Sequence, residues 1–442
     1  MSTLPPGPKL AKAVQTIAMW GYWDRYLEAC RRRYGDVFTV RAAPMGTLVY
    51  FADPEAIKEV FTGDAQTLHA GEANAILAPV LGDRSVLVTD EADHLRRRKL
   101  MLPAFHGDAV RSYAGIVEQV TEDEVDRWPL GRAFELHPRM RELTFEVILR
   151  AVFGVSEPAR LAAMRAALPA LVDLSGLVML MWLKPELGRV GPWKRWLALK
   201  ARADALVVDE VRRRRADPRL DERGDVLSLL LRAGMDDEDE LRDQLVTLLL
   251  AGHETTATGL AWGFERLLRT PDALERTIAA ARDGDDAWLD AVVQETLRVR
   301  PVIFDVIRKL SRPARIAGVD LPTGVLAAPA IGLVHHSPQL YEAPRAFRPE
   351  RFLEGAPAPY TWIPFGGGIR RCLGASFAQM EMRVVLRTVL RRARLRAASA
   401  APERPRARHI TLVPARGARA VVETRSPRAG RIAEQDLAAA GV

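Results

Sequence analysis

The sequence predicts a mainly α-helical fold with a small β-sheet region, built as a single domain. Apolar residues recur at helical spacing along most of the chain, one such pattern is unusually long, and extended patterns are confined to two short regions. The 442 residues, 48% of them apolar, are enough for one large core. Because no repeat or linker divides the chain, we expect one domain over residues 1–423 and a flexible, polar tail over residues 424–442.

The long helical pattern is the central element of this prediction. Acidic residues over 236–240 favour a helix N-terminus, and apolar spacing then continues from Leu241 to Leu268, until Thr270 and Pro271 stop it. At a rise of 1.5 Å per residue, such a helix is on the order of 45 Å long, enough to cross the whole molecule.

The other elements lie before and after this helix. One extended segment is predicted over Val37–Phe51, where Asp53-Pro54 closes it. Downstream, helical patterns cover Ala273–Ala281 and Ala287–Arg298, and strand-like pieces interrupted by prolines follow over Val302–Ala328. Helices therefore dominate the prediction, and strands are a minor component.

Composition excludes several classes of protein. Two cysteines, Cys30 and Cys372, rule out a disulfide framework and indicate a reducing compartment, so we expect a cytoplasmic protein. The N-terminus lacks the apolar core of a signal peptide. The longest lipophilic stretch, Leu171–Leu183, contains Asp173 and is shorter than the roughly 20 residues that cross a bilayer, so no transmembrane anchor is expected.

The formal net charge of +8 would suit an acidic partner or a nucleic acid. Basic residues are nevertheless spread along the chain and interleave with acids, and the run Arg212–Arg215 is more simply the solvated end of a helix. We therefore expect no nucleic-acid partner.

The strongest functional signal is the segment FGGGIRRCLG, Phe365–Gly374, in which Cys372 follows a glycine run and precedes a helical pattern that begins near Ala375. A cysteine binds iron as the thiolate, and the N-terminus of a helix favours that negative charge. The glycines allow a tight loop, and Phe365 can shield the sulfur from water. The plain structural alternative is a buried free cysteine beside a glycine turn.

The pattern Phe-x-x-Gly-x-Arg-x-Cys-x-Gly resembles the haem-ligand signature of the cytochrome P450 family. Further segments match the family in the same order, so the resemblance covers roughly Gly35 to Val422. It implies the cytochrome P450 fold, with haem b between the long distal helix and the helix after the cysteine loop. Cys372 would be the axial iron ligand, Phe365 would cover the sulfur and Arg370 would meet a haem propionate.

The segment from Ala251 to Thr256 in the long helix, AGHETT, resembles the family's oxygen-activation segment. Ala251 and Gly252 would leave room for the porphyrin and for O2. Thr255 can turn its hydroxyl toward the Ala251 carbonyl and loosen the helix locally, and Glu254 would relay protons. The plain alternative is a small-residue helix crossing with a back-bonded threonine. A zinc-protease helix is excluded, because Ala257 stands where that motif needs a second histidine.

Glu295 and Arg298 stand three residues apart and therefore share one face of a helix. Alone, such a pair is usually a solvated surface ion pair. The segment RPERF, which ends at Phe352, resembles the family's second arginine motif. Together the resemblance implies a buried structural triad of Glu295, Arg298 and Arg351 that holds the cysteine loop rather than reacts.

The remaining haem contacts rest on position within the family pattern. His94 and Arg98 lie one helical turn apart and would face one propionate, and Arg308 would meet the haem from the strand after the Glu295 helix. The alternative for each is an ordinary exposed basic residue. His335, His336 and Cys30 match nothing in the pattern and are expected to be structural.

The resemblance implies a monooxygenase that inserts one oxygen atom of O2 into a hydrophobic small molecule of terpenoid, steroid or fatty acyl type. The apolar segments Leu171–Leu183, Ala73–Leu81 and Val302–Phe304 would line or gate its pocket. A haem protein that only binds gas is a second class, but it would need no proton relay at Glu254 and Thr255.

Electrons originating from NAD(P)H would come through a separate ferredoxin or flavodoxin-type partner, or be bypassed by peroxide, since the sequence has no cysteine cluster for an iron–sulfur centre. We expect a monomer. The partner would dock beside the cysteine ligand, on a cationic patch of Arg96, Arg97, Lys99 and Arg371 that suits an acidic ferredoxin. The alternative is that these cations pair with neighbouring acids and cancel.

Overall fold

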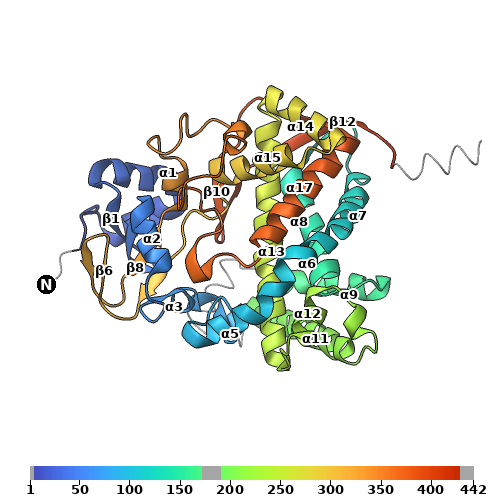
Figure 1. Ribbon diagram of the computed structural model, residues 1–442, viewed down its shortest axis with the longest axis horizontal. Helices are drawn as coiled ribbons and strands as arrows, with labels where there is room; N and C mark the ends of the chain where they lie inside the picture. Colours follow the sequence, from blue (N-terminus) through green and yellow to red (C-terminus); the bar gives the residue numbers. More distant parts are fainter. Residues whose placement is uncertain (1–3, 172–190, 429–442) are drawn as a thin grey trace, which may run out of the picture.

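The computed structural model describes residues 4–171 and 191–428. A five-stranded sheet with helices α1 (Lys12–Tyr34) and α2 (Pro54–Thr62) forms one side of the molecule, and the larger helical part forms the other (Figure 1). The predicted mainly α-helical fold with a small β-sheet region is confirmed.

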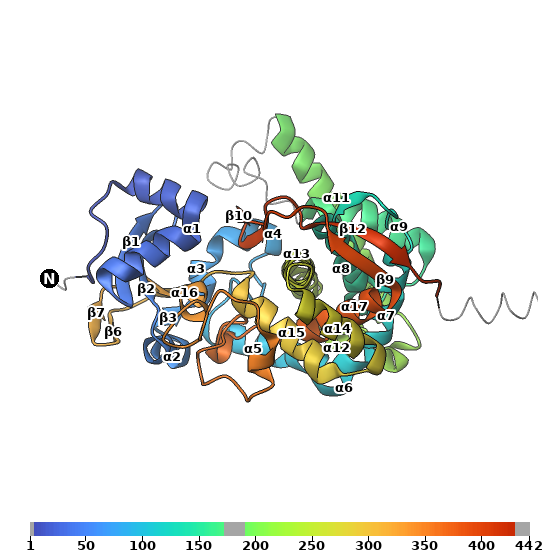
Figure 2. The same ribbon diagram turned by 90° about the horizontal axis from the view of Figure 1, so that it is seen from above.

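The predicted long helix is α13, Glu238–Leu267, a 30-residue helix that begins three residues earlier than its apolar pattern. Asp237 caps it by accepting the Glu240 N–H, and three acids occupy its first turn. Figure 2 shows α13 end-on, surrounded by α8 (Leu136–Val147), α15 (Asp286–Val299) and α17 (Ala375–Arg392), all of which contact it. Its middle is therefore buried on most sides.

The other long helices are α5 (Glu91–Met101), α7 (Ala114–Val125), α9 (Pro158–Ala167), α11 (Gly191–Arg215) and α14 (Pro271–Asp283). Shorter helices are α3 (Ala70–Ala73), α4 (Ala78–Leu81), α6 (Gly107–Ser112), α12 (Val226–Arg232) and α16 (Ile331–His335). The helices predicted over 273–281 and 287–298 are thus confirmed as α14 and α15, each slightly longer than its apolar pattern.

The extended segment predicted over 37–51 is a hairpin of two strands rather than one strand. β1 (Val37–Ala42) pairs antiparallel with β2 (Gly46–Phe51), and Gly46, with φ of 96°, takes the left-handed conformation that reverses the chain. The sheet order is β1-β2-β8-β5-β3, in which β2 runs parallel to β8 (Leu326–Pro329). The last two strands are β5 (Arg308–Leu310) and β3 (Leu68–His69).

Three smaller sheets complete the fold. They are β6 (Ala314–Ile316) with β7 (Val319–Leu321), β10 (Pro405–Arg408) with β11 (Thr411–Pro414), and β4 (Ala133–Glu135) with β12 (Arg419–Arg425) and β9 (Ala393–Ala397). The predicted tail was wrong for residues 424–428. β12 continues to Arg425 because it pairs with β9, and Arg428 forms an ion pair with Asp123 at 2.7 Å. Residues beyond 428 lie outside the described residues.

Alternation along β2 divides the core of the sheet region. Leu48 and Tyr50 enter one hydrophobic cluster, while Val49 and Phe51 enter another on the opposite face. A third and larger cluster lies among the helices around α13. No helix within the described ranges is long and apolar enough to cross a membrane.

Candidate active site

Cys372 lies just before α17, at the helix N-terminus that its sequence predicted. Its N–H donates to the Phe365 carbonyl at 2.9 Å. Burial raises the pKa of its thiol, whereas the Gly374 N–H and the charges of Arg98 and Arg371 oppose that shift. The side chain nevertheless retains accessible surface.

The glycines before the cysteine let the loop pack on the end of α2. Gly366 and Gly368 have φ of 66° and 63°, in the left-handed region. A Cβ added at Gly368 would overlap the Phe61 carbonyl, and one at Gly367 would overlap the Phe61 ring. Any side chain at these two positions would therefore push the loop, and the sulfur with it, away from α2.

Three basic groups near the cysteine loop form no ion pair with a carboxylate of the described residues. His94 and Arg98 are one turn apart on α5, and Arg308 begins β5. His94 is 2% exposed, its Nδ1 has no hydrogen-bond partner among the described residues, and burial lowers its pKa to about 3. Burial also lowers the pKa of Arg98, although the nearby Cys372 acts in the opposite direction. Burial lowers the pKa of Arg308 to about 10.

This donor set fits a haem. A cysteine at a helix N-terminus can bind iron as the thiolate, and basic groups that pair with no carboxylate of the described residues suit the two propionates. The assignment of His94, Arg98 and Arg308 to those propionates stays a prediction.

Arg370 is already engaged. It donates to Asp90 and to the backbone carbonyls of Val86, at 3.1 Å, and Thr89. Burial lowers its pKa to about 10, which Asp90 opposes. Its expected contact with a propionate therefore stays a prediction, and its observed role is to join the cysteine loop to the N-terminus of α5.

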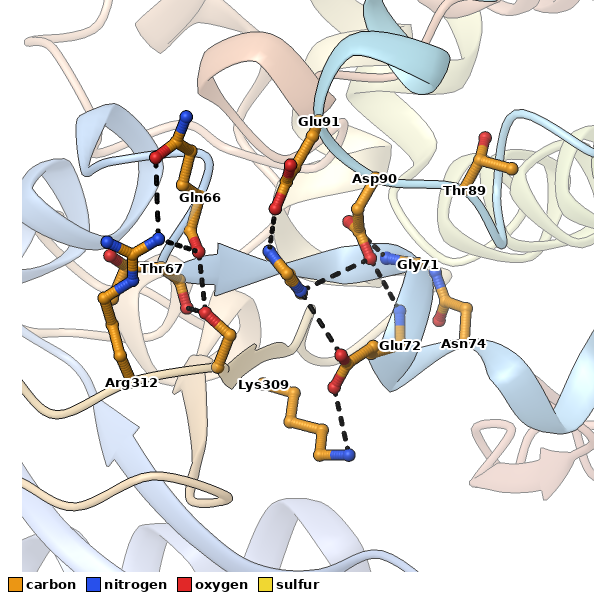
Figure 3. A network of polar contacts seen from close by, with 12 residues as sticks. Gln66, Thr67, Gly71, Glu72, Asn74, Thr89, Asp90, Glu91, Lys309 and Arg312 are labelled. Carbon is orange, nitrogen blue, oxygen red and sulfur yellow. Dashed lines mark hydrogen bonds and ion pairs between the residues drawn. The ribbon is translucent and has the colours of Figure 1, made fainter.

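Asp90 is the centre of a wider polar network (Figure 3). It accepts the backbone N–H groups of Gly71 and Glu72, both at 2.8 Å, and the Glu72 carboxylate pairs with Lys309 at 3.0 Å. His69 Nε2 lies 3.1 Å from Glu91. The network fixes α3 and β5 to the start of α5, beside Arg308.

The loop of residues 82–90 is held from α13 as well. Asp243 accepts the Arg84 N–H at 3.0 Å, Gln244 accepts the Val86 N–H at 2.9 Å, and Thr247 donates to Ser85 at 2.6 Å. This loop, hereafter the 82–90 loop, therefore connects α13 to the cysteine loop through Arg370. No local motif marks this connection, because its partners are far apart along the chain.

The middle of α13 has the expected back-bonded threonine. Thr255 Oγ1 donates to the Ala251 carbonyl at 2.6 Å, which confirms that prediction. A Cβ at Gly252 would lie 2.9 Å from Ile148 Cδ1, so the missing side chain makes room for this neighbour. The expectation that Gly252 leaves space for the porphyrin stays a prediction.

Glu254 is surrounded by three basic groups from two other elements, α8 and β10. Arg141 Nε, on α8, is 2.7 Å from its carboxylate, Arg408 Nε is at 3.5 Å and His137 Nε2 is at 3.6 Å. Burial lowers the pKa of His137 to about 3, so this histidine is neutral. Sequence reasoning missed Arg141 and Arg408, which no local motif marks.

A cavity of about 290 Å³ lies beside this cluster. Its lining comes from α13, from α8, from the turn between β10 and β11, and from Pro169; the residues are Arg141, Pro169, Leu250, His253, Glu254, Thr255, Arg408, His409, Ile410 and Thr411. The cavity therefore adjoins both residues expected to handle oxygen and protons.

The predicted triad is confirmed. The side chains of Glu295 and Arg298 are fully buried and 2.6 Å apart, and Arg351 Nε lies 3.2 Å from Glu295. Arg298 also donates to the backbone carbonyls of His335 and Pro344, both at 2.7 Å. The triad thus fastens the segment that precedes the cysteine loop to α15.

The expected cationic patch was wrong for Arg97. This side chain is 8% exposed and lies 2.8 Å from Glu240 at the start of α13, and Glu240 also binds Arg96. Lys99 and Arg371 are exposed, as predicted. Arg96 and Arg97 are therefore paired with an acid of α13, Glu240, and not only with the neighbouring acids of α5.

Of the segments expected around the pocket, two lie within the described residues and the third lies almost entirely outside them. The segment 73–81 folds into short helical turns, including α4, and Val302 and Phe304 are buried. Residues 172–183 lie outside the described residues.

Cys30 is buried, and His335 Nε2 accepts the Ile363 N–H at 2.9 Å, in accordance with structural roles.

Comparison with known proteins agrees with this geometry. The family model described as Cytochrome P450 matches residues 3–419. The chain is 49% identical over 427 residues to the putative cytochrome P450 135B1 of Mycobacterium tuberculosis (strain ATCC 25618 / H37Rv), covering 94% of this chain and 90% of the relative. It is 42% identical to the putative cytochrome P450 135A1 of the same strain, with 94% of each chain covered.

Solved structures share the fold. The retinoic acid-bound cyanobacterial CYP120A1 superposes with a TM-score of 0.81 at 22% identity, covering 96% of this chain and 100% of that one. A cytochrome P450DA haem domain gives a TM-score of 0.80, also at 22% identity, covering 97% and 99%.

Proposed function

The chain belongs to the cytochrome P450 family and is a haem-thiolate monooxygenase, and from that premise we propose that it hydroxylates an apolar small molecule, with Cys372 as iron ligand and a separate protein as electron donor. The bound haem supplies the activation of O2. The residues of this chain would hold the haem, position the substrate and handle the protons.

The position of Cys372 is the observation that carries the proposal. The Gly374 N–H, Arg98 and Arg371 all favour the thiolate over the thiol, against the effect of burial. His94, Arg98 and Arg308 would hold the propionates, because each is a basic group without a carboxylate partner among the described residues.

Thr255 and Glu254 would manage the protons. The Thr255 hydroxyl donates its hydrogen to the Ala251 carbonyl, so its oxygen can accept a hydrogen bond from a donor in the cavity. Glu254 lines the same cavity and can exchange protons with water there.

The substrate would be a hydrophobic molecule of terpenoid, steroid or fatty acyl type. Leu250 and Ile410 give the cavity beside Thr255 apolar surface. Such a lining favours burial of an apolar ligand at about 25 cal/mol per Å².

The electron donor would be a ferredoxin or a flavodoxin-type protein that takes its electrons from NAD(P)H. Lys99 on α5 and Arg371 in the cysteine loop are both exposed, and they would attract its acidic surface.

The test is turnover with isotopically labelled O2. The haem-loaded protein, a ferredoxin with its NAD(P)H-dependent reductase, and substrates selected by a shift of the Soret band should yield a product that carries one labelled oxygen atom. Product without the label, or consumption of O2 that never yields an oxygenated product from any ligand that shifts the band, would contradict the proposal.

A further inference from the structure

Asp90 stands directly before α5, at the position where an aspartate ordinarily caps its own helix. Such a cap accepts a backbone N–H group from the first turn of the helix that follows. The Asp90 side chain makes no such bond. It accepts instead the N–H groups of Gly71 and Glu72 on α3, both at 2.8 Å (Figure 3). Its carboxylate therefore binds other segments than its own helix.

The backbone around Asp90 has two unusual features that permit this arrangement. Glu91, the next residue, has φ of 49°, in the left-handed region that is unfavourable for a residue with a side chain. A Cβ added at Gly71 would lie 2.6 Å from Asp90 Oδ2 and 2.7 Å from the Thr89 carbonyl oxygen. Only a glycine therefore lets α3 approach the carboxylate so closely.

The third partner of Asp90 is Arg370, in the cysteine loop. Arg370 Nη2 donates to Asp90 Oδ1, and Arg370 Nη1 donates to the Val86 carbonyl at 3.1 Å. The two side chains are 10% and 14% exposed, so solvent and salt screen their charges only weakly. One carboxylate thus connects α3, the start of α5 and the loop that carries the cysteine.

The charges of this pair reach the basic groups assigned to the haem propionates. Burial is the main cause that lowers the pKa of His94 to about 3 and that of Arg308 to about 10. In both cases the charge of Arg370 adds to the shift, and the charge of Asp90 opposes it. Asp90 and Arg370 therefore act electrostatically on the part of the site where the propionates would lie.

We propose that Asp90 is a positioning residue of the haem site, which holds Arg370 in place and whose negative charge makes the haem harder to reduce. This inference rests on the proposed function, because it requires a haem on Cys372 with its propionates at His94 and Arg308. Uptake of an electron adds negative charge to the haem, and a weakly screened carboxylate in the same site opposes that addition. The pairing with Asp90 also offsets the positive charge with which Arg370 would favour reduction.

The experiment measures the ferric–ferrous midpoint potential of the haem-loaded protein, by a redox titration followed through the Soret band. Asp90→Asn keeps the size of the side chain and an oxygen that can accept a backbone N–H, but it removes the charge. Its potential should rise, so that the equilibrium constant for reduction increases severalfold. Asp90→Glu retains the charge and should stay close to the unaltered protein.

Glu91→Gln is the matched control. It removes the same charge one residue along the chain, from a side chain that is 49% exposed and contacts His69 instead of Arg370. Because solvent screens this charge, the potential should hardly change.

Hydrogen exchange of the haem-loaded protein tests the positioning role separately from the charge. Asp90→Ala removes every acceptor, so the backbone N–H groups of Gly71 and Glu72, and those of the cysteine loop, should exchange severalfold faster. Asp90→Asn should change these rates less, because its amide oxygen can still accept. Loss of haem from Asp90→Asn but not from Asp90→Glu would likewise support a site that depends on this charge.

An unchanged potential in an Asp90→Asn protein that binds haem would overturn the inference, and so would a Glu91→Gln protein with an equally large shift. A purely structural ion pair would give the first of these results together with faster exchange. Either result can occur while the reduced, carbon monoxide-bound protein keeps its thiolate-type Soret band and oxygenates apolar ligands. The proposed function fails in a different way, by absence of that band or of oxygenated product from the unaltered protein.

Discussion

Two glutamates, each contacted by two arginines, show how differently this protein uses the same residue types. Glu295 is fully buried and receives hydrogen bonds from Arg298, from Arg351 and from the Arg348 backbone N–H. Glu254 is 15% exposed, lies beside a cavity, and its Oε1 has no hydrogen bond within the described ranges. A carboxylate whose acceptor positions are filled fixes geometry, whereas one with an open position can exchange a proton.

The largest effect should come from substitution of Cys372, whose loop the Glu295 triad helps to hold. Cys372→Ala should abolish the red-shifted Soret band of the reduced, carbon monoxide-bound protein, because it removes the only thiol near the haem contacts. Cys30→Ala should leave the band unchanged, since Cys30 is 3% exposed in the other part of the core. Retention of the band without Cys372 would refute the ligand assignment.

The comparison of the two glutamates can be measured directly. Glu295→Gln should lower the free energy of unfolding by about 3–5 kcal/mol, because it leaves the buried Arg298 charge without its partner. Glu254→Gln should lower it by about 1 kcal/mol or less, as for partly exposed ion pairs. Urea unfolding of the haem-loaded variants gives both values, and similar losses would end the distinction.

Substitution of Thr255 on α13 should reduce the yield of the reaction rather than the stability of the fold. Thr255→Ala should keep haem and substrate binding, yet product formed per electron should fall severalfold and peroxide should rise, because proton delivery to bound O2 is disturbed. The measurement is the ratio of product to NAD(P)H consumed. An unchanged ratio would mean that Thr255 is only a structural residue of α13.

The smallest effect concerns the surface beside the cysteine loop. Lys99→Glu should slow reduction by an acidic ferredoxin a few-fold at low salt, and the difference should shrink as salt shortens the Debye length to about 8 Å at physiological ionic strength. Peroxide-driven turnover should be unaffected. Arg97 is unsuitable for this test because its charge is buried against Glu240. Equal loss of both activities would exclude a docking role for Lys99.

Local sequence spacing predicted the parts of the site that depend on local geometry. Thr255 and Ala251 are four residues apart on one helix, and Glu295 and Arg298 are three apart, so helical periodicity alone brings each pair together. The loop before Cys372 was likewise readable, because its glycines and the following helix are adjacent in the chain.

Contacts between distant segments were not predictable in this way. Arg97 was expected at the surface, but its partner Glu240 lies on α13. The ion pair between Arg370, which was expected to meet a propionate, and Asp90 at the start of α5 was not foreseen either. Arg141 and Arg408 reach Glu254 from α8 and from β10. Their partners are set by how helices pack, and a single sequence does not state that packing.

The 82–90 loop has a consequence for energetics at a distance. It is bonded to Asp243, Gln244 and Thr247 on α13 and, through Arg370, to the cysteine loop. A substrate bound against α13 and a protein docked beside Cys372 therefore act on one connected unit, and we expect their binding free energies to be coupled. Thermodynamic linkage makes such coupling reciprocal. If substrate raises the affinity for the electron donor by some factor, the electron donor raises the affinity for substrate by the same factor.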